Sequence, residues 1–176
     1  MIRVPGVVAI FFCFLLVVAA GANANDCKFV RVEINPIAPG RTDIFIGRTE
    51  QIEVRFDNDK TDGTIEVFPE PPMTVISRRS KTKCFIDGGV WVRNSVYASD
   101  NNEILMTHEF SGSNDSLNFY NVQTCQRINQ IDVSNSTWEI QGSEITVREQ
   151  SVIEGKGSAA VKVYSLNASC HLSSCK

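Results

Sequence analysis

Residues 90–133 read VWVRNSVYASDNNEILMTHEFSGSNDSLNFYNVQTCQRINQIDV and contain four strand-like segments in a row. Apolar and polar residues alternate within each segment, and turn-forming residues separate them: SDNN, then SGSNDS, then a short turn. Such a meander has the form of one four-stranded propeller blade. No second copy of the pattern is evident, so a blade-like sheet packed on another sheet, as a sandwich or irregular barrel, fits better than a closed propeller.

The rest of the chain follows the same pattern. Period-two alternation and turn chemistry predict further short strands, and no helical period of useful length occurs. The predicted strands are 28–34, 43–46, 51–56, 64–68, 74–77, 90–97, 104–110, 117–122, 127–133, 138–141, 144–148 and 159–166. We therefore predict an all-β fold of antiparallel strands.

The first 24 residues are typical of a secretory signal peptide. Arg3 precedes an apolar run at 7–20, and Ala22-Asn23-Ala24 presents small residues at both specificity positions of a cleavage site. The run is shorter than the roughly 20 residues of a spanning helix. We expect a signal peptide at 1–24, a single all-β domain at 25–176 and no membrane span.

The cysteines indicate disulfides. Of six in the chain, Cys13 lies in the leader, which leaves five in an oxidising compartment and predicts two disulfides with one thiol left over. Sequence alone does not fix the pairing. The strand ends favour Cys84 with Cys125, and the chain ends favour Cys27 with Cys170 or Cys175.

Charge and motifs exclude several classes of function. The formal net charge of −3 argues against nucleic acid or an anionic membrane as partner. The acidic run DNDKTDG at 57–63 lacks the calcium-loop spacing and is interpreted as a solvated turn. His108 and His171 lack a partner set for catalysis or zinc binding. We expect no enzyme activity, no cofactor and no metal.

The remaining candidate is the SGSNDS tip, 111–116. Six small or polar residues are more than a hairpin needs, since two would suffice. A tip without long or apolar side chains could enter a narrow cleft and form hydrogen bonds there, and loops on a rigid β scaffold commonly carry recognition. An ordinary surface loop is the alternative interpretation.

Residues 99–142, behind a signal peptide, resemble the periplasmic immunity proteins that neutralise type VI secretion peptidoglycan amidases, in particular those against the first amidase-effector family. The resemblance implies that a loop plugs the amidase cleft and that a serine contacts the histidine of a Cys-His pair. Here the loop would be 111–116, with Ser111 or Ser113 as the serine and Gly112 permitting close approach. Glu109, Asn114 and Asp115 would form rim contacts.

Two rival functions stay open from the residues alone. An inhibitor of a lysozyme-type hydrolase would use the same tip against a different enzyme. A non-inhibitory surface-binding β module would use a sheet face and leave the tip without a role.

Overall fold

A computed structural model describes residues 27–58, 65–69, 72–150 and 160–173. These residues form strands and turns, and the part of the chain that is described contains no helix able to cross a membrane. The predicted signal peptide, most of the DNDKTDG turn and Cys175 lie outside the described residues.

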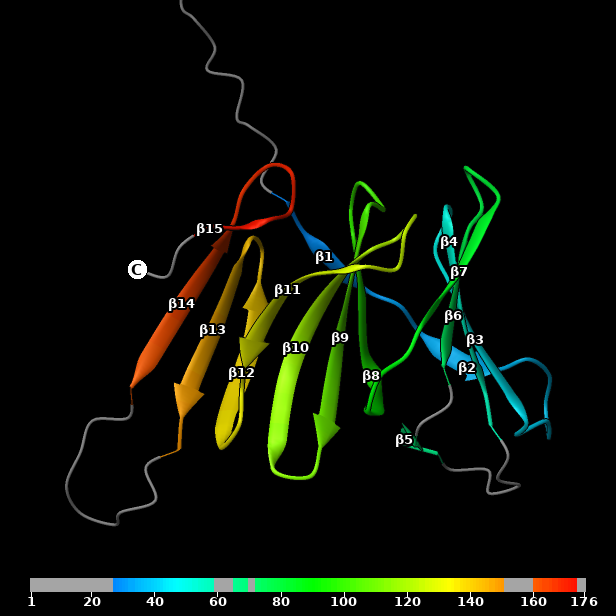
Figure 1. Ribbon diagram of the computed structural model, residues 1–176, viewed down its shortest axis with the longest axis horizontal. Helices are drawn as coiled ribbons and strands as arrows, with labels where there is room; N and C mark the ends of the chain where they lie inside the picture. Colours follow the sequence, from blue (N-terminus) through cyan, green and yellow to red (C-terminus); the bar gives the residue numbers. More distant parts are fainter. Residues whose placement is uncertain (1–26, 59–64, 70–71, 151–159, 174–176) are drawn as a thin grey trace, which may run out of the picture.

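The strands form three antiparallel sheets, which stand side by side in Figure 1. The central sheet has the order β1-β8-β9-β10-β11, with β5 paired to β8. Its strands are β1 (Phe29–Arg31), β5 (Val67–Pro69), β8 (Val90–Ser99), β9 (Ile104–Ser111), β10 (Asn114–Asn121) and β11 (Arg127–Asp132). The predicted meander of residues 90–133 is therefore confirmed as four consecutive neighbouring strands.

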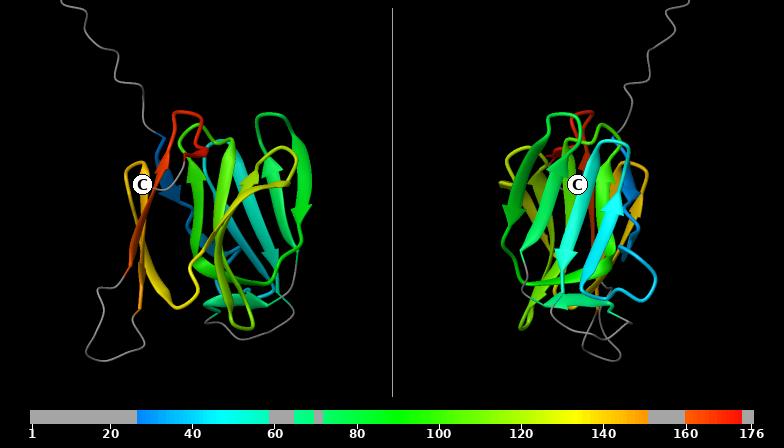
Figure 2. Two further views of the ribbon diagram at one scale, coloured as in Figure 1. Left: turned by 60° about the vertical axis from the view of Figure 1, so that its left-hand side comes forward. Right: turned by 90° about the vertical axis from the view of Figure 1, so that its right-hand side faces the viewer.

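The other two sheets flank the central one. The N-terminal sheet comprises β2 (Ile34–Pro36), β3 (Ile44–Arg48), β4 (Ile52–Asp57), β6 (Met73–Ser77) and β7 (Thr82–Ile86), in that order. The C-terminal sheet comprises β12 (Ser136–Gln141), β13 (Glu144–Glu149), β14 (Val161–Leu166) and β15 (Leu172–Ser173). Figure 2 shows that the sheets do not close into a barrel. The prediction of an antiparallel all-β fold is confirmed, in a three-layer form.

The central sheet has a hydrophobic core on each face. Leu105 and Tyr120 belong to the core shared with the N-terminal sheet, where Trp91 and three phenylalanines pack. Their neighbours Met106 and Phe119 belong to the core shared with the C-terminal sheet. Since successive strand residues point to opposite faces, a central strand between two sheets buries both sets. Both flanking sheets are thus held by the same strands.

The predicted strands do not match the observed strands everywhere. The predicted strand 28–34 is divided between β1 of the central sheet and β2 of the N-terminal sheet. Val32 lies between them, buried, with its backbone N–H donating to the Val96 carbonyl. The strands β7 and β15 were not predicted, because the sequence TKCFI of β7 offers only a brief alternation and β15 has only two residues.

Two disulfides cross-link the fold at distant points of the sequence. Cys84 of β7 is bonded to Cys125 in the β10–β11 turn, which ties the N-terminal sheet to the central one. Cys27 is bonded to Cys170, which joins the start of β1 to the β14–β15 turn. Both pairings agree with those expected, and Cys170 rather than Cys175 is the partner of Cys27.

Candidate functional site: the β9–β10 hairpin

The β9–β10 hairpin projects from one end of the central sheet, at the bottom of Figure 1. Its two strands pair without a register shift from Ile104↔Asn121 to Ser111↔Asn114. The turn therefore consists of Gly112 and Ser113 alone. The predicted six-residue loop at 111–116 is wrong in this respect, because Asp115 and Ser116 are already in β10.

The turn geometry depends on Gly112. Its φ is +62°, whereas Ser113 has no positive φ, which is the pattern of a type II′ turn with glycine at the first central position. A Cβ at Gly112 would meet nothing within 4 Å. Ser111, Ser113 and Asn114 are exposed. The tip, residues 111–114, is thus narrow, polar and exposed.

On the face towards the C-terminal sheet, a hydrogen bond between two side chains supports the hairpin. His108 of β9 lies with its Nε2 2.5 Å from Asp115 Oδ1 of β10, and its ring meets the edge of Trp138 at 5.4 Å between centroids. The Asp115 backbone N–H donates to Ser134 Oγ. His108 is thus partly buried and hydrogen-bonded, and Asp115 is half-exposed while engaged within the hairpin.

On the opposite face, towards the N-terminal sheet, a buried polar cluster supports the hairpin. Glu109 is only 6% exposed, and its Oε1 accepts hydrogen bonds from Thr107 Oγ1 at 2.5 Å and from the Tyr120 hydroxyl at 2.9 Å. Burial raises the pKa of the Glu109 carboxyl, against the lowering effect of these two donors. Burial and the nearby carboxylate raise the pKa of Tyr120. Glu109 was expected on the rim, and the structure instead places it in the interior.

Glycines leave room for this cluster. A Cβ at Gly88 would lie 2.3 Å from Trp91 Cζ2 and 2.9 Å from Glu109 Oε2, and one at Gly89 would lie 2.7 Å from the Phe110 carbonyl oxygen. A hollow of about 240 Å³ lies along the Glu109 face of the hairpin, between these glycines and Arg127. The Gly88-Gly89 segment thus fits closely against β9.

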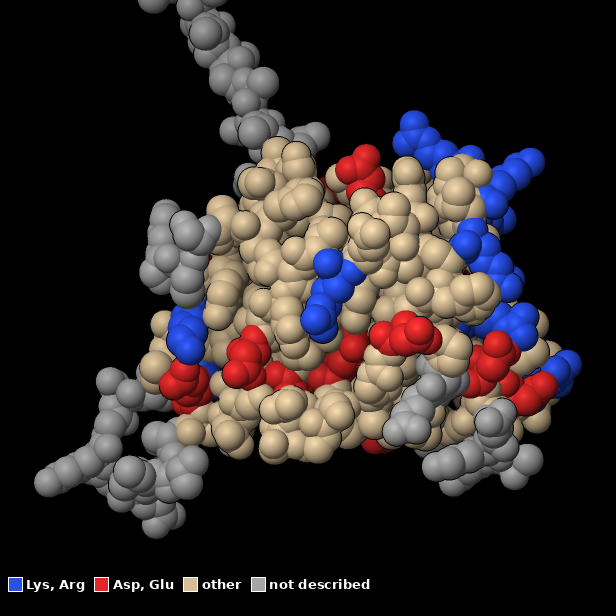
Figure 3. Space-filling model, in the orientation of Figure 1, with Lys and Arg blue, Asp and Glu red and all other residues tan. Residues whose placement is uncertain are grey.

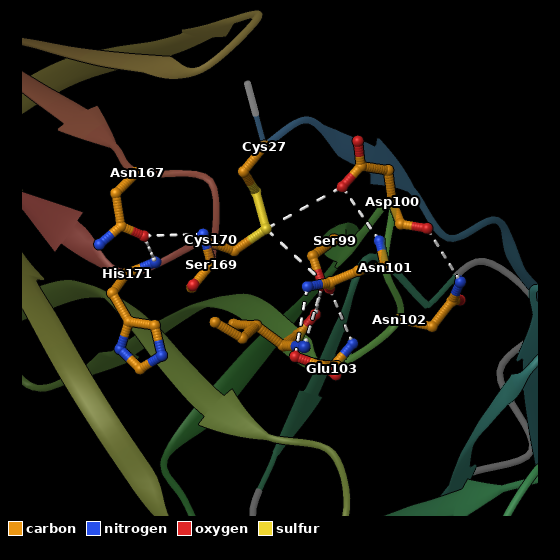
Figure 4. The surroundings of a disulfide bond; sticks show 11 residues. Cys27, Ser99, Asp100, Asn101, Asn102, Glu103, Asn167, Ser169, Cys170 and His171 are labelled. Carbon is orange, nitrogen blue, oxygen red and sulfur yellow. Dashed lines mark hydrogen bonds between the residues drawn. A yellow bond between two sulfur atoms is a disulfide. The ribbon is translucent and has the colours of Figure 1, made fainter. Parts of the chain in front are cut away.

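The cysteines in the described part of the chain supply no thiol for catalysis or metal binding. All four are in disulfides, so none of them supplies a thiolate. Figure 4 shows the Cys27–Cys170 bond beside Asp100 and Asn101, whose side-chain oxygens lie 4.0 Å from Cys170 Sγ. This grouping resembles a metal-ligand set, but oxidised sulfur does not ligate as a thiolate. The disulfide lies against the β8–β9 turn.

Comparison with known proteins gives one family. A family model described as "Immune protein Tsi1" matches residues 27–170. The immune protein Tsi1 of Pseudomonas aeruginosa is 34% identical over 147 residues, which cover 82% of this chain and 85% of that protein. A solved structure titled "Crystal structure of the eukaryotic initiation factor" covers 84% of this chain and 42% of its own, with a TM-score of 0.34 and 10% identity, a likeness that carries no argument. The chain therefore belongs to the Tsi1 immune protein family, and the prediction of an immunity protein is confirmed.

Proposed function

We propose that this protein is exported to the periplasm and neutralises a type VI secretion peptidoglycan amidase by inserting the β9–β10 tip into the enzyme's active-site cleft. An immune protein implies a cognate toxic effector, and the resemblance of residues 99–142 implies a Cys-His amidase. The carrying observation is the tip itself: a two-residue turn whose small polar side chains are exposed.

Size and chemistry both suit the tip for a cleft that admits a peptide substrate. Only two residues lie beyond the last strand pair, so the end of the hairpin is about as thin as a folded chain can be. Ser111 and Ser113 offer hydroxyl groups that donate or accept a hydrogen bond to an imidazole. Ser113 lies in the turn, beyond Ser111, so we assign the deeper contact to Ser113.

The support of the hairpin favours tight binding. The His108–Asp115 hydrogen bond supports the face towards the C-terminal sheet. The Glu109 cluster supports the face towards the N-terminal sheet. A hairpin already ordered in the free protein loses little conformational entropy on binding, so more of the contact energy appears as affinity. We assign Asn114 and the exposed part of Asp115 to rim contacts, and Glu109 to support from within.

Export is supported by the disulfides. Bonds between Cys27 and Cys170 and between Cys84 and Cys125 form and persist in oxidising compartments such as the bacterial periplasm. Residues 1–24 would supply the signal peptide, and residues 25–176 the mature single domain.

The test is to block the tip without unfolding the protein. The double variant Ser111→Arg/Ser113→Arg should lose inhibition of the cognate amidase while keeping its circular dichroism spectrum and thermal midpoint. The single variants rank the two serines, and Ser113→Arg should have the larger effect.

A matched control exists in the same molecule. The β12–β13 turn is also Gly-Ser, with Gly142 at φ +61° and Gln141 paired to Glu144. Figure 1 shows it at the opposite end of the molecule from the β9–β10 tip. Gln141→Arg/Ser143→Arg should leave inhibition unchanged. Full inhibition by the β9–β10 double variant would refute the plug, and inhibition of a lysozyme-type hydrolase but not of the amidase would refute the assigned target.

A further inference from the structure

The β6–β7 hairpin carries a concentration of positive charge that the proposed function does not use. Residues 78–83 read RRSKTK, so four of the chain's 17 lysines and arginines fall within six residues. The net charge of the whole chain is −3, and the remainder is therefore clearly acidic. We call residues 78–83 the basic tip. Figure 3 shows Lys and Arg gathered at this end of the molecule.

The cations of the basic tip are exposed and carry no compensating charge. Arg78, Arg79, Lys81 and Lys83 are all exposed. No ion pair within the described residues engages any of the four. The sequence from Ser77 to Ile86 contains no Asp or Glu. Four like charges at one turn repel one another, and an anionic partner would relieve that repulsion.

The turn presents these charges in a defined way. β6 and β7 pair through to Ser77↔Thr82, and Lys81 has a φ of +56°. Ser80 Oγ lies 2.8 Å from Thr82 Oγ1, and the Ser80 backbone N–H donates to Ser77 Oγ at 3.3 Å. The basic tip is thus an ordered projection of the N-terminal sheet.

An exposed aromatic side chain lies beside the charges. Phe85 is 56% exposed, on β7, which is an edge strand of its sheet. Lys83 and Phe85 are two residues apart and share the outward face, and Lys83 Nζ lies 5.0 Å from the centroid of the Phe85 ring. Solvent-exposed aromatic rings among lysines and arginines are typical of segments that bind the interface of an anionic membrane.

The net charge of the whole chain argues against an anionic membrane as partner, but four exposed cations gather at one turn. We propose that the basic tip and Phe85 form a peripheral binding site for a bilayer containing anionic phospholipid. The cations would contact lipid phosphates, and the Phe85 ring would enter the headgroup region. The acidic remainder of the chain would be repelled by the same surface, so the protein binds by this end alone. Binding is reversible and weakens with salt.

The position of the basic tip gives this binding a consequence. In Figure 1 the β6–β7 turn lies at the top of the molecule, and the β9–β10 tip lies at the bottom. A protein held by the first would present the second away from the bilayer. This orientation bears on function only if the proposed export and plug are correct, whereas the lipid binding itself is independent of both.

Co-sedimentation with vesicles tests the proposal. The purified protein should bind vesicles of phosphatidylcholine mixed with phosphatidylglycerol at low ionic strength, and should not bind phosphatidylcholine alone. Replacing all four cations of the basic tip with glutamine should weaken binding by about tenfold or more. Phe85→Ser should weaken binding several-fold while leaving the salt dependence in place.

The control removes the same charge elsewhere. Lys28, Arg41, Arg148 and Lys162 are exposed and lie outside the basic tip. Their fourfold glutamine variant should keep most of the binding. Failure of the wild-type protein to bind the anionic vesicles would overturn the proposal, as would equal losses in the two fourfold variants. A basic-tip variant that binds vesicles normally but no longer inhibits the effector would assign the surface to a protein partner instead, and overturn it as well.

Discussion

Removing the Cys84–Cys125 disulfide should lower the free energy of unfolding substantially. The bond links β7, an edge strand of the N-terminal sheet, to the β10–β11 turn of the central sheet. Both cysteines also pack against the core that these two sheets share. The double variant Cys84→Ala/Cys125→Ala removes the cross-link without leaving an unpaired thiol.

The magnitude follows from the length of chain that the bond closes. A separation of 41 residues corresponds to about 4 kcal/mol of denatured-state entropy at room temperature. The Cys27–Cys170 bond spans 143 residues and corresponds to about 5 kcal/mol. Cys27 and Cys170 are also more deeply buried, so lost packing acts in the same direction as chain entropy. The variant lacking Cys27–Cys170 should therefore be the less stable of the two.

Urea unfolding without reductant measures both losses. With a slope of about 2 kcal/mol per molar urea, the Cys84→Ala/Cys125→Ala variant should unfold at about 2 M less urea than the wild-type protein. The thermal midpoint should fall in the same order. A shift under about 0.5 M would refute the chain-entropy estimate. A larger loss for the shorter loop than for the longer one would refute its length dependence.

Three further substitutions test the support and the turn of the hairpin. Because burial raises the pKa of Glu109 above its usual 4.5, this residue contributes stability that is complete below pH 4.5 and is lost as pH rises through its folded-state pKa. Glu109→Gln should remove that dependence and leave stability at neutral pH equal or higher, as measured by urea unfolding across pH; an unchanged pH profile would contradict it. Gly89→Ala should cost about 3 kcal/mol, because its Cβ would lie 2.7 Å from the Phe110 carbonyl oxygen. Gly112→Ala, with open space around it, should cost about 1 kcal/mol through its positive φ alone, and the reverse order in thermal unfolding would contradict the contact geometry.

The central sheet was predictable because its signals are strong and local. Alternation and turn residues located β8 to β11, and the strand ends suggested which cysteines meet. The covering of the central sheet on both faces was not predicted, although the sequence of β9 indicates it. Ile104, Leu105 and Met106 are consecutive apolar residues, which indicates a strand buried on both faces rather than one.

The two errors at the hairpin have separate causes. Glu109 lies in phase with Leu105, on the face assumed to be solvated, and that face is covered by the N-terminal sheet. The polar run SGSNDS suggested a loop, yet pairing continues to Ser111 and Asn114 because the end of a hairpin tolerates polar side chains in strand conformation. Composition alone could not distinguish a solvated strand end from a loop.

The shared central sheet predicts that the two cores unfold together. Leu105 and Met106 are adjacent in β9 and face opposite cores, so one core cannot lose its strand without disturbing the other. The chain has two tryptophans, and each reports one core: Trp91 is fully buried on the N-terminal side, and Trp138 packs on the C-terminal side. Trp138→Phe leaves only the first probe and Trp91→Phe only the second. In each variant the fluorescence transition in urea should coincide with the loss of circular dichroism, as expected of a single cooperative unit. If the Trp138 signal changes at a lower urea concentration than the circular dichroism of the same variant, the C-terminal sheet unfolds separately and the central sheet does not couple the layers.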